Sequence, residues 1–240
     1  MSGPRLGLFG RGRLGSAILA EAGPGVLWTV DLGEAPSAPV DVAIDASVAE
    51  AVPGHLAWAL DTGTDLVIGA TGWSLPDLEA RVGGRIGVLA ASNFSLTVAL
   101  MARLATVLGR YADLDPTRDP FLVERHHRLK ADAPSGTAKT LAAAVLAGCT
   151  RKTAWTLGTP APHELSIGVV RAGAEFGRHT VGLDAPAEVL ELTHTARSRA
   201  PFAQGALAAA RWLQGRKGVF TMDDLAADLL DPLFAFGGKP

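Results

Sequence analysis

The sequence predicts an α/β protein: an N-terminal Rossmann-type doubly wound parallel sheet, then a smaller α+β domain with a mixed or antiparallel sheet. A glycine-rich loop joins the first apolar run to a helix-forming run. Short apolar runs then alternate with helix-forming runs up to residue 96, which is typical of parallel sheets. After residue 97, later apolar runs are separated by glycine- and proline-containing turns, which favours a mixed or antiparallel sheet.

Composition narrows the class of protein. The chain has 240 residues, 48% of them hydrophobic, which is enough for one large domain or two smaller ones. A net charge of −2 without long basic runs argues against nucleic acid as the main partner. A single cysteine, Cys149, excludes an internal disulfide framework and a cysteine-rich metal site. We find no signal-like segment and no membrane-length apolar run, so we expect a cytoplasmic protein with no membrane partner.

The first loop has the spacing of a dinucleotide-binding turn. Residues 5–9 form an expected strand, and a helix is expected from Ala17. Between them, the first glycine permits a tight turn, the second lets a pyrophosphate approach the backbone, and the third lets the helix pack on the sheet. An alternative is a glycine-rich turn without a ligand. The candidate cofactor-binding residues here are Gly10, Arg11, Gly12, Arg13, Leu14 and Gly15.

The second expected strand, residues 26–30, ends at Asp31. An acidic residue about 20 positions after the first glycine accepts hydrogen bonds from the ribose hydroxyls of NAD and repels the 2′-phosphate of NADP. Asp31 therefore favours NADH. Arg11 and Arg13 keep NADPH open, because either guanidinium could reach that phosphate. A turn residue with no role is the alternative for Asp31.

Further expected strands at 40–44, 66–68 and 86–90 alternate with helices near 48–60 and 75–82. Ligands of such sheets bind beyond the carboxyl ends of the strands. The small polar loops at those ends are candidates for the ribose and nicotinamide parts of a cofactor, although ordinary strand-to-helix turns are equally consistent with them. Their candidate residues are Gly69, Ala70 and Thr71 in one loop, and Ala91, Ser92, Asn93 and Phe94 in the other.

The densest group of reactive side chains lies in residues 124–138, after an expected helix at 96–110 and a strand at 121–123. Two histidines and a lysine lie within five positions, and a helix is expected from Ser135. The first N–H groups of a helix have no internal partner and attract anions, so the Ser135-Gly136-Thr137 segment is a candidate carboxylate site. If the strand continued to His127, then His126 and His127 would point to opposite faces.

The rest of the chain has three expected strands, at 165–171, 179–183 and 189–194. Their sheet offers a plausible oligomer surface. Helices are expected at 202–213 and from a cap at Thr221 onward.

The residues from Glu124 to Ala138 resemble the motif of the dihydrodipicolinate reductase family. Glu124, His126-His127, Lys130, Asp132 and Pro134-Ser135-Gly136-Thr137-Ala138 carry this resemblance. It extends to the glycine loop, the two polar loops and, later, Arg171 with Gly173, His179-Thr180-Val181 and Leu192-Thr193-His194.

The resemblance implies reduction of 4-hydroxy-tetrahydrodipicolinate by NADH or NADPH, with loss of water, in lysine and diaminopimelate biosynthesis. It implies that His126 donates or accepts a proton, that Lys130 is the general acid, and that His127 and the Ser135, Gly136 and Thr137 cradle bind the dicarboxylate. It implies no metal, a homotetramer, and C-terminal helices that return to the nucleotide domain. The expected domains are 1–96, completed by 204–240, for the dinucleotide, and 97–203 for substrate binding and oligomerisation.

Other functions remain open from the residues alone. One is a different Rossmann-type dehydrogenase of a small acid, which would retain full activity without Lys130. Another is a non-catalytic dinucleotide-binding sensor, which would bind NADH and consume none of it. A purely structural protein would not need the Gly10 loop and Asp31 together.

Overall fold

The computed structural model describes residues 3–235, which form two compact units. The first consists of Met1–Leu96 with Arg199–Pro240, and the second of Thr97–Ser198. The chain leaves the first unit once and returns to it once. The sequence placed the return at residue 204, whereas the structure places it at Arg199, just before a helix begins at Ala200. Within the described residues, no helix is both long enough and apolar enough to cross a membrane.

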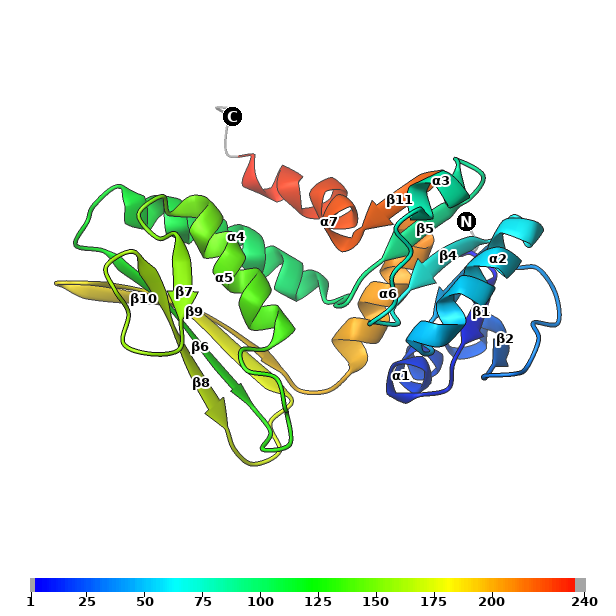
Figure 1. Ribbon diagram of the computed structural model, residues 1–240, viewed down its shortest axis with the longest axis horizontal. Coiled ribbons are helices and arrows are strands. Elements are labelled where there is room, and N and C mark those ends of the chain that lie inside the picture. The colour runs from blue at the N-terminus through cyan, green and yellow to red at the C-terminus, as the bar shows by residue number, and fades with distance from the viewer. Residues whose placement is uncertain (1–2, 236–240) are drawn as a thin grey trace. The chain divides into compact units, whose positions relative to one another are not determined.

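The first unit contains a parallel six-stranded sheet, called sheet A (Figure 1). Its strand order is β11-β5-β4-β3-β1-β2, with β1 at the point where the chain changes direction across the sheet. This order confirms the predicted doubly wound parallel sheet. The edge strand β11 was not predicted. The strands are β1 (Leu6–Phe9), β2 (Val26–Val30), β3 (Val42–Asp45), β4 (Asp65–Ile68), β5 (Gly87–Ala90) and β11 (Gly218–Thr221).

Helices cover both faces of sheet A (Figure 1). Leu8 and Ile44 point to one face, where they pack with Ile18 of α1 and with α6 and α7. Ala43 and Ile68 point to the other face and pack with α2 and α3. This alternation explains why the strands read as continuous apolar runs. The helices are α1 (Arg13–Ala22), α2 (Val52–Thr62), α3 (Leu78–Val82), α6 (Ala200–Leu213) and α7 (Met222–Leu230), with 3-10 turns at Gly23–Gly25, Ala49–Ala51 and Asp231–Phe234.

The second unit contains a mixed five-stranded sheet, called sheet B, with the order β10-β9-β6-β8-β7. The pairs β10–β9 and β9–β6 are antiparallel, and β6–β8 and β8–β7 are parallel. The predicted mixed sheet is thus confirmed, and its short edge strand β7 was not foreseen. The strands are β6 (Asp119–His126), β7 (Ala154–Thr156), β8 (Glu164–Arg171), β9 (Gly177–Ala185) and β10 (Glu188–Ala196).

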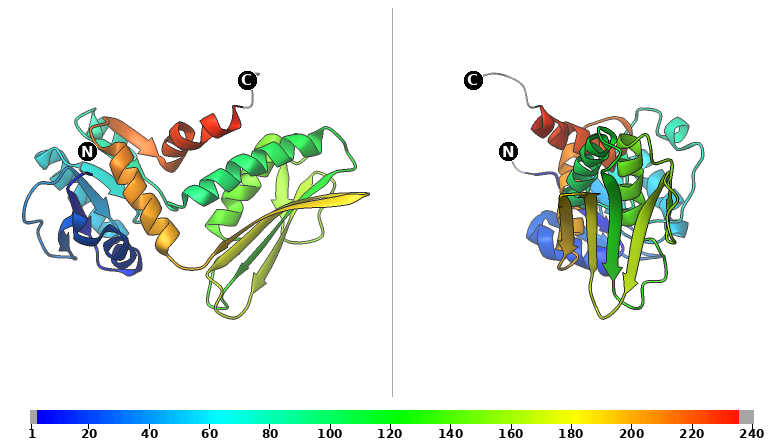
Figure 2. Two further views of the ribbon diagram at one scale, coloured as in Figure 1. Left: turned by 180° about the vertical axis from the view of Figure 1, so that it is seen from behind. Right: turned by 90° about the vertical axis from the view of Figure 1, so that its left-hand side faces the viewer.

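Two helices, α4 (Leu96–Asp113) and α5 (Gly136–Gly148), lie on one face of sheet B (Figure 2). Ala105 of α4 and Leu141 of α5 pack with Leu122 and Val181 of the sheet in one core. Gly109 and Gly148 let the two helices touch, because a Cβ on Gly148 would lie 2.2 Å from the Thr106 carbonyl oxygen. Close packing fixes the direction of α5, and therefore the place of its N-terminus.

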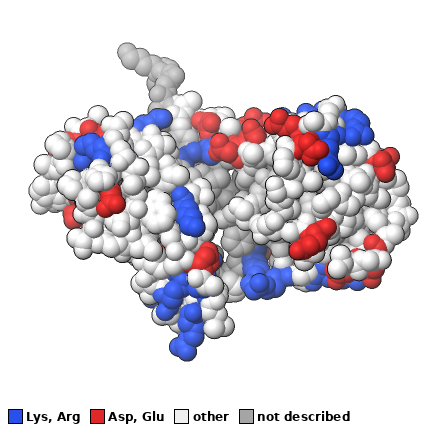
Figure 3. Space-filling model, in the orientation of Figure 1, with Lys and Arg blue, Asp and Glu red and all other residues white. Residues whose placement is uncertain are grey.

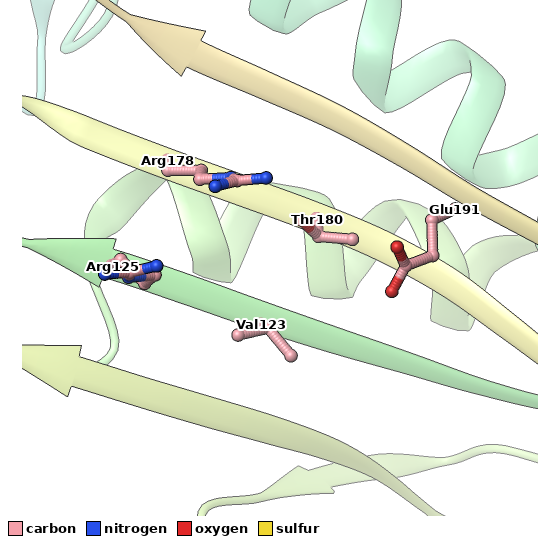
Figure 4. A pocket seen from close by; sticks show the side chains of 5 residues that line it. All are labelled: Val123, Arg125, Arg178, Thr180 and Glu191. Carbon is pink, nitrogen blue, oxygen red and sulfur yellow. The ribbon is translucent and has the colours of Figure 1, made fainter.

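Within residues 3–235, no helix covers the other face of sheet B, which carries polar side chains (Figure 4). Arg125 of β6 lies opposite Arg178 of β9, and Glu191 extends from β10 toward the same hollow, which Val123 and Thr180 complete. Two arginines directly opposite each other repel. Glu175 offsets part of this charge, because its carboxylate lies 3.5 Å from the Arg125 guanidinium.

Candidate functional site

The glycine loop of the first unit gives each of its three glycines a separate steric role. Gly10 has φ +91, and a Cβ there would meet the Ala46 backbone. A Cβ on Gly15 would lie 2.0 Å from the Gly10 carbonyl oxygen, so α1 needs glycine to pack there. A Cβ on Gly12 would meet nothing within 4 Å. The backbone at Gly12, the N-cap of α1, is therefore open to a ligand such as a pyrophosphate, and no side chain caps that helix.

Asp31 follows β2 at the carboxyl edge of sheet A, where its carboxylate is exposed. Its Oδ1 accepts a hydrogen bond from the Leu32 N–H at 3.1 Å, and the second oxygen remains available to a ribose. Arg11 and Arg13 differ in their surroundings. The Arg11 guanidinium is 2.9 Å from the Glu34 carboxylate and donates to the Thr29 carbonyl at 2.7 Å. Arg13 is exposed and has no hydrogen bond or ion pair to any residue that the structure describes.

Five of the other predicted cofactor residues come together around one hollow of the first unit. Leu14 of the glycine loop, Gly69 after β4, and the segment Ser92-Asn93-Phe94 after β5 line it, together with Arg199 and Phe202. Gly205 of α6 allows this arrangement, because a Cβ there would lie 1.7 Å from the Phe94 carbonyl oxygen. The hollow therefore joins three loops from the carboxyl edge of sheet A, where doubly wound sheets bind their ligands.

Three predicted cofactor residues have different surroundings from the rest. Ala70 is buried, and its N–H donates to Asp45 while its carbonyl accepts from the Trp73 indole, so its own groups are already engaged. Ala91 is half-buried and donates to the Ile68 carbonyl at 3.0 Å. Thr71 is exposed beside the Gly69 turn.

In the second unit, residues 124–138 leave β6, turn, and enter α5. The helix begins at Gly136, and Ser135 is its N-cap, with the Ser135 hydroxyl accepting from the Ala138 N–H at 3.1 Å. Gly136 is exposed, and a Cβ on it would meet nothing within 4 Å. The first turn of α5 thus presents an open backbone, as a carboxylate site requires.

A buried carboxylate, Glu124, holds this turn together. Its side chain is fully buried, and its Oε1 accepts hydrogen bonds from the Ser135 N–H at 3.0 Å and from Arg171 Nη2 at 2.7 Å. Arg171 also donates to the Asp132 carbonyl at 2.6 Å. Burial alone would raise the pKa of Glu124, but these donors outweigh it and lower the pKa below the ordinary value. Glu124 is therefore an anion that links β6, β8 and α5.

Two buried histidines lie against Glu124. Strand register brings them there: Glu124 pairs with His179 on β9, and His126 pairs with Arg171 on β8. His126 Nδ1 is 3.3 Å and His179 Nε2 is 3.5 Å from Glu124 Oε2, and the rings meet edge to face with centroids 5.1 Å apart. His179 Nε2 also lies 3.1 Å from the Ser135 hydroxyl. The histidines thus share one carboxylate with the helix cap.

Both imidazoles are electrically neutral at neutral pH. Burial is the main cause that lowers the pKa of His126, and the neighbouring Lys130 and Arg171 charges add to it. Burial also lowers the pKa of His179, to about 4, with the His126 ring as the next cause. Gly177 leaves room for the His126 ring, because a Cβ there would lie 2.9 Å from His126 Nε2.

Lys130 and His127 lie in the turn that follows β6. The strand ends at His126, so the expected alternation of His126 and His127 across the sheet does not apply. His126 is buried, whereas His127 is half-buried and donates its backbone N–H to Glu175 at 2.8 Å. Lys130 Nζ is 2.7 Å from Asp132 Oδ1, which keeps the ammonium group beside the turn. That contact is the main cause that lowers the pKa of Asp132.

The charge around this turn suits an anionic ligand. Lys and Arg side chains gather at the end of the second unit where β6 and β8 finish (Figure 3). Arg128 is exposed in this turn, close in the chain to Lys130, whereas Arg125 and Arg178 are exposed on the opposite face of sheet B. An excess of cations near open helix N–H groups attracts dicarboxylates.

Glu124, His126 and His179 also lie close enough to meet the spacing of a metal site, with ligand atoms within 4.8 Å of one another. Arg171 argues against a cation, because its guanidinium already pairs with the Glu124 carboxylate. These groups form a hydrogen-bonded support for the turn.

Several residues of the two sites were not predicted as site residues. Glu124, Arg171 and His179 entered only through the family resemblance, because sequence spacing does not show which strands pair. Glu34 was not considered, although the preceding Gly33 signals a turn that could direct it back to Asp31. Asp45, whose carboxylate accepts from Ser47 and lies 2.8 Å from His55 Nδ1, was treated only as part of a loop.

Comparisons with known proteins agree along the chain. Residues 11–94 match the family "Dihydrodipicolinate reductase, N-terminus", and residues 95–226 match "Dihydrodipicolinate reductase, C-terminus". A 4-hydroxy-tetrahydrodipicolinate reductase of Magnetococcus marinus is 38% identical over 85% of this chain and 80% of its own length. One of Gluconobacter oxydans is 37% identical over 93% of this chain and 97% of its own length.

A solved structure shares the fold. The dipicolinate-bound dihydrodipicolinate reductase from Paenisporosarcina sp. TG-14 superimposes with a TM-score of 0.73 at 20% identity, covering 92% of this chain and 98% of that one. Family matches to both parts of the chain, and relatives that span most of it, confirm the resemblance that the sequence had indicated. The chain belongs to the dihydrodipicolinate reductase family of oxidoreductases.

Proposed function

We propose that this chain reduces 4-hydroxy-tetrahydrodipicolinate to tetrahydrodipicolinate with loss of water, in lysine and diaminopimelate biosynthesis. Family membership supports the reaction. The observation that carries the proposal is the turn from Glu124 to Gly136, which brings a lysine and two buried histidines next to the exposed backbone at the start of α5. A pyridine nucleotide fits the first unit, where Gly12 and Asp31 offer an open backbone and a ribose acceptor.

Different residues bind the substrate carboxylates and supply the proton. The Gly136 and Thr137 backbone and the His127 side chain bind the carboxylates, and the α5 N-terminus stabilises their charge. Ser135 holds this helix start in place, because its N–H donates to Glu124. A bound reduced nicotinamide supplies the hydride. Reduction then requires a proton, and a positioned acid is typically worth about 10²–10⁴-fold in rate. Lys130 is the donor, because it lies in the turn before α5, whereas burial lowers the pKa of His126 and disfavours a charged imidazole. His126 instead contacts and orients the substrate.

We further propose that NADH is preferred over NADPH. Asp31 supports this preference, because its exposed carboxylate at the end of β2 can accept from both ribose hydroxyls and repels a 2′-phosphate.

We also propose a cytoplasmic homotetramer. The face of sheet B opposite α4 and α5 supports an assembly, because Val189 on its edge strand β10 is 60% exposed, and Arg178 and Glu191 offer charge partners. Sedimentation equilibrium of the purified chain tests this: a mass of one subunit at micromolar concentration would refute the tetramer.

A coupled assay tests the function. The substrate is generated in situ from its biosynthetic precursors, and oxidation of NADH and of NADPH is followed separately. We expect Lys130→Ala to lower kcat by about 10²-fold or more. Lys139→Ala is the matched control, because Lys139 is an exposed lysine one turn into α5.

Two outcomes would favour other functions. Full activity of Lys130→Ala toward a different small acid would indicate another dehydrogenase. Binding of NADH without its consumption by the wild-type chain would indicate a dinucleotide sensor.

A further inference from the structure

The turn after β2 folds a second carboxylate back onto Asp31. The Glu34 N–H donates to the Asp31 carbonyl at 3.0 Å, and Gly33 has φ +85, as the third position of a type II turn requires. In return, the Asp31 N–H donates to Glu34 Oε2 at 2.8 Å. The two residues therefore hold each other through two hydrogen bonds, and the Glu34 carboxylate lies at the carboxyl end of β2.

The same carboxylate holds Arg11 of the glycine loop. Arg11 Nη2 lies 2.9 Å from Glu34 Oε2, Arg11 Nη1 lies 3.3 Å from Glu34 Oε1, and Nη2 also donates to the Thr29 carbonyl at 2.7 Å. The pKa of Glu34 is lowered, mainly by the Asp31 N–H and next by Arg11, so Glu34 stays ionised throughout the neutral range. Arg11 is thus engaged with an internal anion.

These donors are the kind that bind a phosphate. A backbone N–H and a guanidinium beside the end of the second strand are where a doubly wound fold accommodates the 2′-phosphate of NADP. Here both donate to Glu34. We propose that Glu34 occupies the place of the 2′-phosphate and is the residue that excludes NADPH.

This inference rests on the proposed function, because it assumes that the first unit binds a pyridine nucleotide. It differs from the role of Asp31. Asp31 accepts hydrogen bonds from the ribose hydroxyls of NADH. Glu34 instead occupies the Asp31 N–H and the Arg11 guanidinium, the two donors that would bind the 2′-phosphate of NADPH. A bound 2′-phosphate would have to displace Glu34 from Arg11 and would then lie beside two carboxylates. Replacing Glu34 by a neutral residue therefore has two effects: it frees the Arg11 guanidinium, and it removes one negative charge near the phosphate position.

The test measures dissociation constants by calorimetry for NADH, NADPH and adenosine 2′,5′-bisphosphate, a probe that carries the 2′-phosphate without the nicotinamide. For Glu34→Ala we expect NADPH and the bisphosphate to bind about tenfold more tightly, the gain of one charge-assisted hydrogen bond. NADH affinity should change less than threefold. Arg11→Ala added to Glu34→Ala should abolish the gain, because the freed guanidinium provides it.

Asp77→Asn is the matched control. Asp77 pairs with Arg81 at 2.8 Å on the surface of the same unit, and both side chains are about as exposed as those of Arg11 and Glu34. This variant changes the net charge equally, but Asp77 is the N-cap of α3, away from the glycine loop in the chain, so the affinity for neither cofactor should change. A gain in NADPH affinity in Asp77→Asn as large as in Glu34→Ala would attribute the effect to net charge and overturn the proposal.

The remaining outcomes separate this inference from the proposed function. Unchanged NADPH affinity in Glu34→Ala, with normal NADH binding, would refute the role of Glu34 and leave the reductase function intact. Failure of the wild-type chain to bind either nucleotide would refute the proposed function itself. Normal NADH affinity in each variant also shows that the unit is folded.

Discussion

Replacing Glu124 by Gln should destabilise the second unit, because its carboxylate links β6, β8 and α5. The side chain of Glu124 is fully buried and that of Arg171 is 17% exposed, with 2.7 Å between Oε1 and Nη2. Removing one partner of a buried ion pair typically costs about 3–5 kcal/mol. Solvent reaches part of Arg171, so we expect the lower end of that range, about 3 kcal/mol. In a chain of this size that corresponds to a fall in Tm of roughly 6–12 °C.

The measurement is urea and thermal unfolding of Glu124→Gln beside wild type, with Glu175→Gln as control. Glu175 pairs with Arg125 at 3.5 Å on the open face of the same sheet, and an exposed pair of this kind contributes at most about 1 kcal/mol. Because the Ser135 N–H loses its charged acceptor, the substrate KM should also rise. An unfolding free energy for Glu124→Gln within 0.5 kcal/mol of wild type would show that Glu124 is not the support we describe.

Three further predictions concern the same unit. The pKa of His179 is about 4, below its value of about 6.5 in an unfolded chain, so the unfolded state binds more protons between those values. The free energy of unfolding should therefore fall by up to about 3 kcal/mol between pH 6.5 and pH 4. In His179→Asn, the free energy of unfolding should depend less on pH over this range. An equal pH dependence in the wild-type and variant chains would contradict the effect of His179 burial. Gly136→Val should raise the substrate KM about tenfold or more by filling the open backbone site, and an unchanged KM would exclude carboxylate binding there. Gly177→Ala should lower kcat with NADH affinity unchanged, because its Cβ would displace the His126 ring, and a wild-type kcat would show that the ring position is unimportant.

The architecture was predictable wherever local patterns agreed with tertiary structure. Three features were located closely because neighbouring residues alone determine them. They are the glycine loop, the alternation of strands and helices up to β5, and the helix cap at Ser135. Strands β7 and β11 lie at sheet edges, and their short runs of three and four residues have no periodicity of their own. Only pairing to β8 and β5 makes them strands.

The sites were less predictable because they depend on pairing between distant segments. His126 could be identified from its motif, but its neighbours Arg171 and His179 come from β8 and β9, and their approach depends on strand register. The role of Glu34 was also hidden from the sequence, although its partners are closer in the chain. Its distance from Asp31 in the chain is short, yet its role follows only from the direction of its side chain toward Arg11.

Burial separates the two histidines from the lysine, and no motif contains that information. His126 and Lys130 are both plausible acids from sequence, since both are basic side chains near a substrate turn. Burial within the Glu124 cluster disfavours a charged imidazole, whereas Lys130 reaches the surface, 24% exposed, and pairs with Asp132. The proton for the reaction therefore comes from Lys130 in our interpretation. If kcat followed an apparent pKa below that of ordinary histidine, and this dependence disappeared in His126→Asn with Lys130→Ala still active, the assignment would pass to His126.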